Sequence, residues 1–445
     1  MFNPSVPYEF DCVHFWAPFG GPVVTPFEYT GWRDETLAWK DSAYLGTALS
    51  LMSPTVKIKG PDVIKFLSDH FVNSFAKFSV GGTKHGIMCN EEGLNMMDGI
   101  IIRTAEDEVI TYWLDPYISY CLQKGKYNAT GENLSGGKVF FYQVAGPRSL
   151  EILEEASGDD LHDIKFFRHR MSRIAGKDVR ILRMGMAGTL AYEVHGNMED
   201  GQDVYKAIFV AGKGYGMKKL GHRAYMMNHT EDGFPQAYYH FPYPWKEDAG
   251  FAEYLNKTGQ SFFVADLNLV GSMGKDVKLR YRNPVELGWA DMIKFEHDFV
   301  GRKALEKMVA NPKRKMVTLE WNGEDITDIY ASQFRDEKPY RQMDMPNDMY
   351  FIPGPMSYHA DQVLKDGKVI GISSGRAISQ FYHRMISLSS IDTKFSALGT
   401  EVIVLWGDPG TRQKQVRAKV ARFPYLKEER NSEIDVSKIP RAAKK

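Results

Sequence analysis

The sequence has few cysteines and no net charge, and each of these absences excludes a class of function. Its three cysteines, Cys12, Cys89 and Cys121, are an odd number without Cys-x-x-Cys spacing, so neither a disulfide framework nor a zinc site is predicted. There is no excess of either charge, because 56 Lys plus Arg balance 56 Asp plus Glu. No long-range field therefore draws the protein to nucleic acid or an anionic membrane, and any charged partner has to be recognised locally.

Long apolar runs and common cofactor motifs are also missing. No run of the roughly 18 apolar residues that a membrane span requires occurs, and residues 1–7 do not resemble a signal peptide. The sequence has no Walker loop, no Gly-x-Gly-x-x-Gly that opens a helix and no His-Glu-x-x-His. We therefore expect a cytoplasmic protein with no metal, no nucleic-acid partner and no membrane partner.

What is present is an ordinary globular composition with a recurring unit. The 445 residues are 43% hydrophobic, enough for two or three cores. Residues 56–67 and 139–153 both give a strand, a Gly-Pro turn at Gly60 or Gly146, and a helix. Two copies are too few for a solenoid and predict an α+β region.

Two carboxylates stand out in the first half of the chain. Residues 86–102 predict a hairpin with its turn at residues 90–93, and Asp98 precedes three isoleucines there. Asp98 is either a carboxylate held at the mouth of a buried strand or a turn-forming Asp-Gly. Glu193 follows a glycine-containing turn on a short strand. It is either a surface residue on an edge strand or the acceptor for two parallel N–H donors of a flat ligand such as a pterin.

The residue pattern changes twice in the second half of the chain. Residues 200–220 predict a helix that ends at Gly221, and residues 234–245 hold six aromatics and three prolines. This segment cannot be a regular helix, so it is a long ordered loop that is either functional or packed on its own domain.

From Met316 onward, six short strands with turns at Asp366 and Gly407 predict a small, barrel-like β domain. We expect a catalytic region at residues 1–310, built from two interleaved α+β subdomains, a β domain at 311–426 and a charged mobile tail at 427–445.

Nine short motifs then occur in a familiar order. They are Gly60-Pro-Asp, Gly93-x4-Asp98, Val144-Ala-Gly-Pro147, Tyr192-Glu193, Gly221-x-Arg223, Glu286-Leu-Gly-Trp289, Phe299-Val-Gly-Arg302, Val369-Ile-Gly-Ile-Ser-Ser-Gly375 and Gly399-Thr-Glu-Val-Ile-Val404. Together they resemble the aminomethyltransferase family, which contains the glycine-cleavage T-protein and its tetrahydrofolate-dependent relatives. Residues 27–35, 73–76, 185–188 and 295–305 most resemble the folate-dependent O-demethylases of the vanillate and syringate type.

The resemblance implies a three-part α+β fold, with antiparallel sheets and helices around a central pocket that holds tetrahydrofolate and a C-terminal β-barrel-like domain. Glu193 matches the carboxylate that grips the pterin edge, and Tyr192 and Arg223 are expected beside the cofactor. Asp98 falls where the T-protein has paired aspartates, of which one remains here beside Met97.

The reaction implied is methyl transfer from an ether oxygen to N5 of the folate. The departing oxygen needs a proton or a hydrogen bond, and a tyrosine hydroxyl can supply it. Tyr243 matches the position of such a tyrosine in the O-demethylases, Tyr29 is a second candidate, and Asp98 is the third catalytic candidate. Tyr112, Trp113 and Trp245 are expected to line the donor site.

The donor itself stays open at this point. Residues 48–54 lack the Gln and His of the vanillate-type enzymes, and Leu114 stands where those enzymes have an arginine. A carboxylated donor would need Arg103 or Arg223, although Arg103 could equally be an exposed strand residue. We expect a folate-dependent demethylase of a small methoxylated, aromatic donor. The alternatives are a sulfonium or quaternary ammonium donor, whose cation could rest on aromatic faces, and a non-catalytic folate-binding protein of the same fold. The oligomeric state is not predicted.

Overall fold

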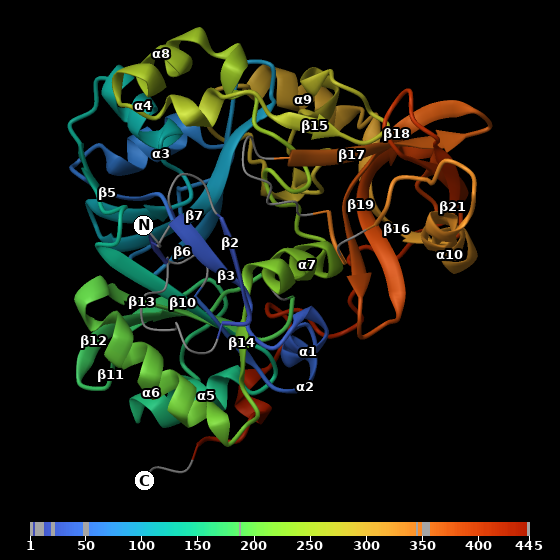
Figure 1. The fold of residues 1–445 in the computed structure, drawn as a ribbon. Helices are drawn as coiled ribbons and strands as arrows, with labels where there is room; N and C mark the ends of the chain where they lie inside the picture. Colours follow the sequence, from blue (N-terminus) through green and yellow to red (C-terminus); the bar gives the residue numbers. More distant parts are fainter. Residues whose placement is uncertain are drawn as a thin grey trace.

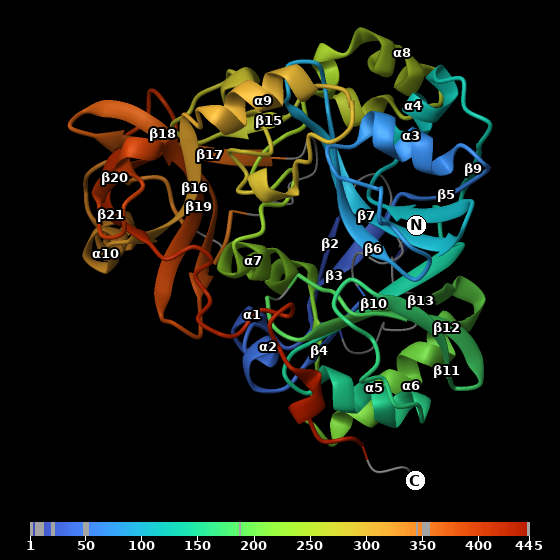
Figure 2. The same cartoon turned by 180° about the vertical axis from the view of Figure 1, so that it is seen from behind.

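The computed structural model describes residues 3–4, 13–18, 23–47, 53–186, 188–343, 346–348 and 357–442. Cys12 and residues 48–52 lie outside this part of the chain. Three sheet-based parts surround helix α7 (His222–Asp232), which lies in the middle of the molecule (Figures 1 and 2). In the described residues, every helix is too short or too polar to span a bilayer.

The first part is a five-stranded sheet with helices packed on it. Its antiparallel strands follow the order β6-β7-β8-β5-β9, so β6 is an edge strand. The bounds are β5 (Thr55–Lys59), β6 (Thr83–Cys89), β7 (Asn95–Ala105), β8 (Glu108–Tyr112), β9 (Thr130–Asn133), α3 (Val63–His70), α4 (Tyr117–Lys124) and α8 (Ala249–Lys257). The predicted hairpin is confirmed, because β6 and β7 pair across residues 90–94.

The second part is a six-stranded sheet in the order β11-β12-β13-β10-β4-β14. The bounds are β4 (Tyr44–Gly46), β10 (Val139–Ala145), β11 (His169–Ile174), β12 (Lys177–Leu182), β13 (Ala191–Asn197), β14 (Lys218–Leu220), α5 (Ser149–Ser157) and α6 (Gly201–Lys213). The helix expected over residues 200–220 is therefore shorter, and its last residues form β14 instead.

The two predicted strand, Gly-Pro and helix units are confirmed, one in each of these sheets. Gly60 and Gly146 have φ values of 149° and 139°. A Cβ at Gly60 would lie 2.3 Å from the backbone oxygen of Asn128, and one at Gly146 would lie 2.4 Å from that of Ser42. Only glycine tolerates both this backbone and this close approach, so the turn is built the same way twice.

The third part is the C-terminal β domain, in which six strands close into a barrel. Their order is β17-β18-β19-β16-β21-β20, and β20 pairs back with β17. The bounds are β15 (Asn268–Val270), which adds to β17, β16 (Arg314–Trp321), β17 (Ser357–Lys365), β18 (Lys368–Ser379), β19 (Arg384–Asp392), β20 (Glu401–Trp406), β21 (Lys414–Ala421), α9 (Arg302–Ala310) and α10 (Gly323–Ala331). All six strands predicted for this region are found.

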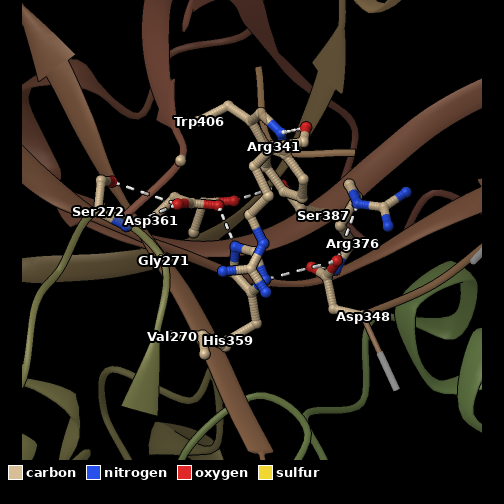
Figure 3. Close-up of polar contacts among 12 residues, drawn as sticks. Val270, Gly271, Ser272, Arg341, Asp348, His359, Asp361, Arg376, Ser387 and Trp406 are labelled. Carbon is tan, nitrogen blue, oxygen red and sulfur yellow. Dashed lines mark hydrogen bonds and ion pairs between the residues drawn. The ribbon is translucent and has the colours of Figure 1, made fainter. Parts of the chain in front are cut away.

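A buried network of charged side chains lies within this domain (Figure 3). His359 Nε2 is 2.7 Å from Asp361 Oδ2, and Arg376 Nε donates to Asp348 Oδ1 at 2.9 Å. The His359 ring stacks on Trp406 at a centroid distance of 4.8 Å. The charged side chains are at most 3% exposed.

Helix α7 links the second and third parts. It contacts β3 (Val23–Glu28), β18 and β19, its Ala224 packs with Tyr44 and Ala145 of the second sheet, and all of its residues are buried. A small sheet of β1 (Asn3–Pro4), β3 and β2 (Phe15–Pro18), with helices α1 (Trp32–Glu35) and α2 (Ala38–Asp41), adjoins it. Residues 234–244 follow α7 without a helix or strand, as expected for an ordered loop.

The segment from Lys427 differs from the expected mobile tail. Asn431 is 4% exposed and donates to the backbone oxygen of Ala191, while Arg183 donates to Asn431 Oδ1 at 3.1 Å. Val436 packs in the core of the second part. A few buried anchors therefore fix a segment whose composition alone is typical of a tail.

Candidate functional site

Glu193 lies in the interior of the second sheet. It is on β13, between β12 and β10, and is 5% exposed, so the interpretation as a surface glutamate is wrong. Its carboxylate accepts from Gln143 Nε2 at 3.3 Å and from His195 Nε2 at 2.9 Å. Gln143 sits directly across from it on β10, and His195 shares its face of β13.

This carboxylate keeps room for further donors. One donor reaches each oxygen, whereas an ionised carboxylate has about four acceptor positions. The Tyr112 and Phe141 rings lie 4.6 and 5.6 Å from the His195 ring. Burial, and then the charge of Glu193, raise the pKa of Tyr112. Among the described residues, His195 Nδ1 has no hydrogen-bond partner. A flat ligand with two N–H donors fits these residues.

Tyr192 does not share this environment. Because successive side chains alternate across a strand, it points to the opposite face from Glu193. Its ring is fully buried in the core cluster that includes Val204 and Ile208 of α6. Tyr192 is therefore a core residue of the second part and not a neighbour of the Glu193 carboxylate.

Asp98 and Tyr243, two of the catalytic candidates, are brought together. The Tyr243 hydroxyl donates to Asp98 Oδ1 at 2.9 Å, across 145 residues of chain. Asn95 Nδ2 donates to the same oxygen at 3.0 Å, and His85 Nε2 donates to Oδ2 at 3.1 Å. We call these four residues the Asp98 cluster. The Asp98 side chain is 12% exposed, so the cluster is enclosed but accessible.

The surroundings of Tyr243 keep its proton in place. Burial, and then the charge of Asp98, raise the pKa of Tyr243 well above its usual range. Its ring stacks on Trp245 at 5.0 Å, and the Trp245 indole donates to the backbone oxygen of Met96 at 2.5 Å. Trp245 is 2% exposed, so it packs against the Tyr243 ring on the buried side.

Tyr29 and Arg223 lie at a third place, beside β3 and the start of α7. Arg223 forms an ion pair with Glu28 at 2.5 Å and lies over the Phe27 ring. The backbone N–H of Tyr29 donates to Glu35, whose other oxygen accepts from Gly221 N–H and so ties the Tyr29 turn to α7.

The two arginines considered for a donor carboxylate are both occupied. Arg103 donates to the backbone oxygens of Phe78, Ala105 and Glu106 and pairs with the Glu106 side chain. Arg223 is already paired with Glu28. Neither presents a free guanidinium fork of the kind that grips a benzoate.

The aromatic candidates for the donor site are divided. Tyr112 and the partly buried Trp113 belong to the cluster beside Glu193, whereas Trp245 belongs with Tyr243. Trp113 has a φ of 64°, an uncommon backbone for a bulky residue, and its N–H donates to the backbone oxygen of Pro54.

Sequence reasoning missed four polar partners of the two carboxylates: His85, Asn95, Gln143 and His195. His195 is two residues from Glu193, and Asn95 is three from Asp98, so strand alternation and proximity gave a signal for these two. His85 and Gln143 could be found only from the strand pairing. Ile87 pairs with Asp98, which brings His85, two residues earlier on β6, next to Asp98. Gln143 pairs directly with Glu193. The two cysteines that the structure describes, Cys89 and Cys121, are buried and free, and burial raises the pKa of Cys121 to about 12, so neither is an activated thiol.

Comparisons with known proteins agree with this architecture. The family model described as the GCVT N-terminal domain matches residues 24–240. The sesamin methylene transferase of Sinomonas sp. is 47% identical over 434 residues, covering 96% of this chain and 95% of the relative. The syringate O-demethylase of a Sphingobium species is 33% identical over 432 residues, covering 91% of both chains.

A more distant relative and a solved structure extend the comparison. The aminomethyltransferase of Oceanobacillus iheyensis is 24% identical over 387 residues, covering 84% of each chain. The crystal structure of the glycine cleavage system aminomethyltransferase T from Bartonella henselae shares the fold with a TM-score of 0.68 at 15% identity, covering 95% of this chain and 97% of that one. The chain therefore belongs to the aminomethyltransferase family and is an enzyme that transfers one-carbon groups.

Proposed function

We propose that this protein is a tetrahydrofolate-dependent demethylase that moves a methyl group from a small methoxylated aromatic donor to N5 of the folate. The observation that carries the proposal is the hydrogen bond between Tyr243 and Asp98. This bond holds a protonated phenol in place, and in our proposal the phenol donates its proton to the departing ether oxygen. The 33% identical relative is named as an O-demethylase, which supports the same assignment.

The proposed folate site is centred on Glu193. Its unfilled acceptor positions suit the two N–H donors on the pterin edge, and charge assistance strengthens such bonds. Tyr112 and Phe141 supply aromatic surface beside it. When bound, tetrahydrofolate supplies the nucleophilic nitrogen that accepts the one-carbon group.

In this proposal the Asp98 cluster positions Tyr243 to protonate the leaving group. Tyr243 has one hydroxyl hydrogen, which points to Asp98 in the structure. Turning that hydrogen toward the donor oxygen leaves Asp98 held by Asn95 and His85, so the carboxylate does not lose all of its partners. General-acid help of this kind contributes about 10²- to 10⁴-fold in rate, and holding the reactants in line contributes further.

A second candidate is the transfer of a methylene bridge from a methylenedioxy aromatic donor. The specific observation in its favour is the 47% identical relative, which is named as a sesamin methylene transferase. A methoxyarene breaks one bond between carbon and an aryl oxygen, and the proton lost from folate N5 balances the phenol formed. A methylenedioxyarene breaks two such bonds in turn, and the protons lost from N5 and N10 balance the catechol. In both reactions Tyr243 would donate a proton to a departing aryl oxygen. The remaining alternatives, a sulfonium or quaternary ammonium donor, would need no such acid.

The test is anaerobic incubation of the protein with tetrahydrofolate and a donor panel, with mass spectrometry of the folate product. The panel contains methoxyarenes, methylenedioxyarenes, betaines and sulfonium compounds. We expect 5-methyltetrahydrofolate from a methoxyarene. 5,10-Methylenetetrahydrofolate from a methylenedioxyarene alone would favour the second candidate, and transfer from sulfonium or ammonium donors alone would reject both. Folate binding without any transfer would indicate a non-catalytic protein.

We also infer that the enzyme works in the cytoplasm on a small-molecule donor. Free, buried thiols at Cys89 and Cys121 suit a reducing compartment. The division into domains near residue 311 remains a prediction.

A further inference from the structure

The loop at residues 234–244 carries Tyr243 but contains no helix or strand. One turn of the loop is closed by its backbone, because the His240 N–H donates to the Gln236 oxygen at 2.8 Å. Tyr243 nevertheless reaches Asp98 in the first part of the molecule, at 2.9 Å. Since the loop has no ladder of backbone hydrogen bonds of its own, contacts with its surroundings have to set its position.

The His240 side chain fastens this loop to α7 and to the barrel. Its Nδ1 accepts from the Gln236 N–H at 2.9 Å, so the ring proton is on Nε2. Nε2 then donates to Thr230 Oγ1 of α7 at 3.2 Å, and Thr230 Oγ1 donates to the Gly375 oxygen of β18 at 2.7 Å. The hydrogen bonds therefore run in one direction, from the loop through α7 to the barrel.

The barrel also contacts His240 directly. The His240 backbone oxygen accepts from Ser374 Oγ at 2.7 Å and from the Tyr358 hydroxyl. Gly375 has a φ of 59°, and a Cβ there would lie 2.3 Å from the His240 ring. Only glycine permits this close approach, so the surface of β18 fits the imidazole. The neighbouring Arg376 side chain belongs to the buried network of the barrel.

The His240 ring is held in its neutral form. Burial, and then the nearby His229, lower the pKa of His240 well below its usual range. A protonated ring would turn a second N–H toward the Gln236 N–H, where it would meet another donor. The neutral tautomer is therefore the one that fits the loop, and it keeps the direction of the bonds through Thr230.

The contact between His240 and Tyr243 runs through Phe241. Phe241 is fully buried, and its ring centroid lies 5.7 Å from that of Tyr243. The Phe241 backbone oxygen accepts from the Tyr238 N–H at 2.7 Å, and the Tyr238 ring lies 5.7 Å from the Tyr243 ring on another side. Because protein interiors are close-packed, a shift of His240 moves these rings and Tyr243 with them.

We propose that His240 is a positioning residue for the transfer reaction, and that it holds Tyr243 against Asp98 by fixing the loop to α7 and the barrel. This inference rests on the proposed function, because it assumes that Tyr243 protonates the departing oxygen. None of the residues proposed for the folate and donor sites lies in the barrel, so this contact gives the barrel a part in the reaction. A shift of about 1 Å near the reacting groups can cost about 100-fold in rate.

The experiment is a double-mutant cycle on the full chain, with kinetics on the methoxyarene that the native protein demethylates fastest and titration calorimetry of tetrahydrofolate. His240→Leu removes both side-chain bonds, so kcat should fall at least about tenfold while folate affinity changes less than about twofold. His240→Gln keeps an N–H at the place of Nε2 and should recover most of the lost kcat. In a Tyr243→Phe background, His240→Leu should cost less than about twofold, because the group that it positions is already gone.

Thr230→Val tests the same chain of hydrogen bonds with almost no change in volume, in case His240→Leu does not fold. It leaves the His240 Nε2–H without its acceptor, so kcat should again fall only when Tyr243 is present. Thr111→Val is the matched control, because Thr111 is equally buried and donates to the Val56 oxygen at 3.2 Å. Its kcat should stay close to native.

Equal losses of kcat in the native and Tyr243→Phe backgrounds would overturn the inference, because His240 would then support the fold and not Tyr243. Native kcat in both His240→Leu and Thr230→Val would also overturn it, as would a loss of folate affinity as large as the loss of kcat. If Tyr243→Phe alone keeps native kcat, the proposed function fails and the inference fails with it. Urea denaturation of each variant checks that it is folded.

Discussion

The buried network in the barrel and the Asp98 cluster both pair a carboxylate with a histidine, but they differ in their access to solvent. In the barrel, Asp361 accepts from His359 and from the Ser272 N–H and hydroxyl, and Asp348 accepts twice from Arg376 (Figure 3). These side chains are sealed, at 1–3% exposure. The Asp98 cluster contains the same kinds of groups, but it is partly accessible and one of its members lines a cleft. Both clusters are largely buried and paired, and the difference between them is access. Under the proposed function, access is what separates a reactive cluster from a structural one.

The largest effect is expected from breaking the barrel network. Arg376→Leu leaves Asp348 as a buried carboxylate without its cation, which should cost about 3–5 kcal/mol in the free energy of unfolding. Urea denaturation measures this loss, and turnover per folded molecule should not change. Glu324→Gln, which breaks an exposed pair with Arg417 on the same domain, should cost at most about 1 kcal/mol. Equal costs would contradict the distinction.

The next largest effect is expected at Tyr243. Tyr243→Phe keeps the ring on Trp245 but removes the hydroxyl, so turnover of an ether donor should fall by about 100-fold or more. Steady-state kinetics measures the loss, while unfolding and folate affinity should remain near those of the native protein. Tyr425→Phe, which removes a hydroxyl bonded to Glu320, is the matched control. Turnover close to native would instead favour a sulfonium or ammonium donor.

A smaller effect on binding is expected at Glu193. Glu193→Gln replaces a charged acceptor by a neutral amide, so folate affinity should weaken about 10- to 100-fold. Titration calorimetry measures it, and the KM of the donor should stay unchanged. Glu132→Gln, at an exposed ion pair on β9, should alter neither quantity. Equal losses for folate and donor would show that Glu193 does not act on the pterin.

The smallest effect is expected at His85. His85→Gln keeps an N–H for Asp98 but removes the imidazole ring, so turnover should fall only about threefold. Steady-state kinetics is the measurement. A loss as large as that of Tyr243→Phe would mean that His85 does more than hold Asp98 in place.

The sequence predicts the elements whose pattern is local. The short strand-like runs and the turns between them after Met316 gave all six barrel strands, and the Gly60 and Gly146 turns gave the two strand-to-helix units. Helix α7 was not predicted, because it is buried on all sides and has no apolar stripe to reveal it. Residues 427–442 were misjudged because composition does not show that Asn431 reaches the interior.

The candidate site was predicted only in part for a similar reason. The family resemblance singled out Glu193, Asp98 and Tyr243 separately, and the structure brings the last two together. It also grouped Tyr192 with Glu193, although neighbours on a strand point to opposite faces. Gln143 lies 50 residues from Glu193 in the sequence and meets it only through the register of β10 and β13. Partners of this kind require the fold.

The central claim is that Glu193 binds the folate while the Asp98 cluster performs the transfer. The most direct test is the single-turnover rate of one-carbon transfer, measured at saturating tetrahydrofolate and donor for Glu193→Gln and Tyr243→Phe side by side. We predict that Glu193→Gln recovers to within about threefold of the native rate, and that Tyr243→Phe stays about 100-fold slower. Recovery of Tyr243→Phe, or an equal persistent loss in both variants, would contradict the claim.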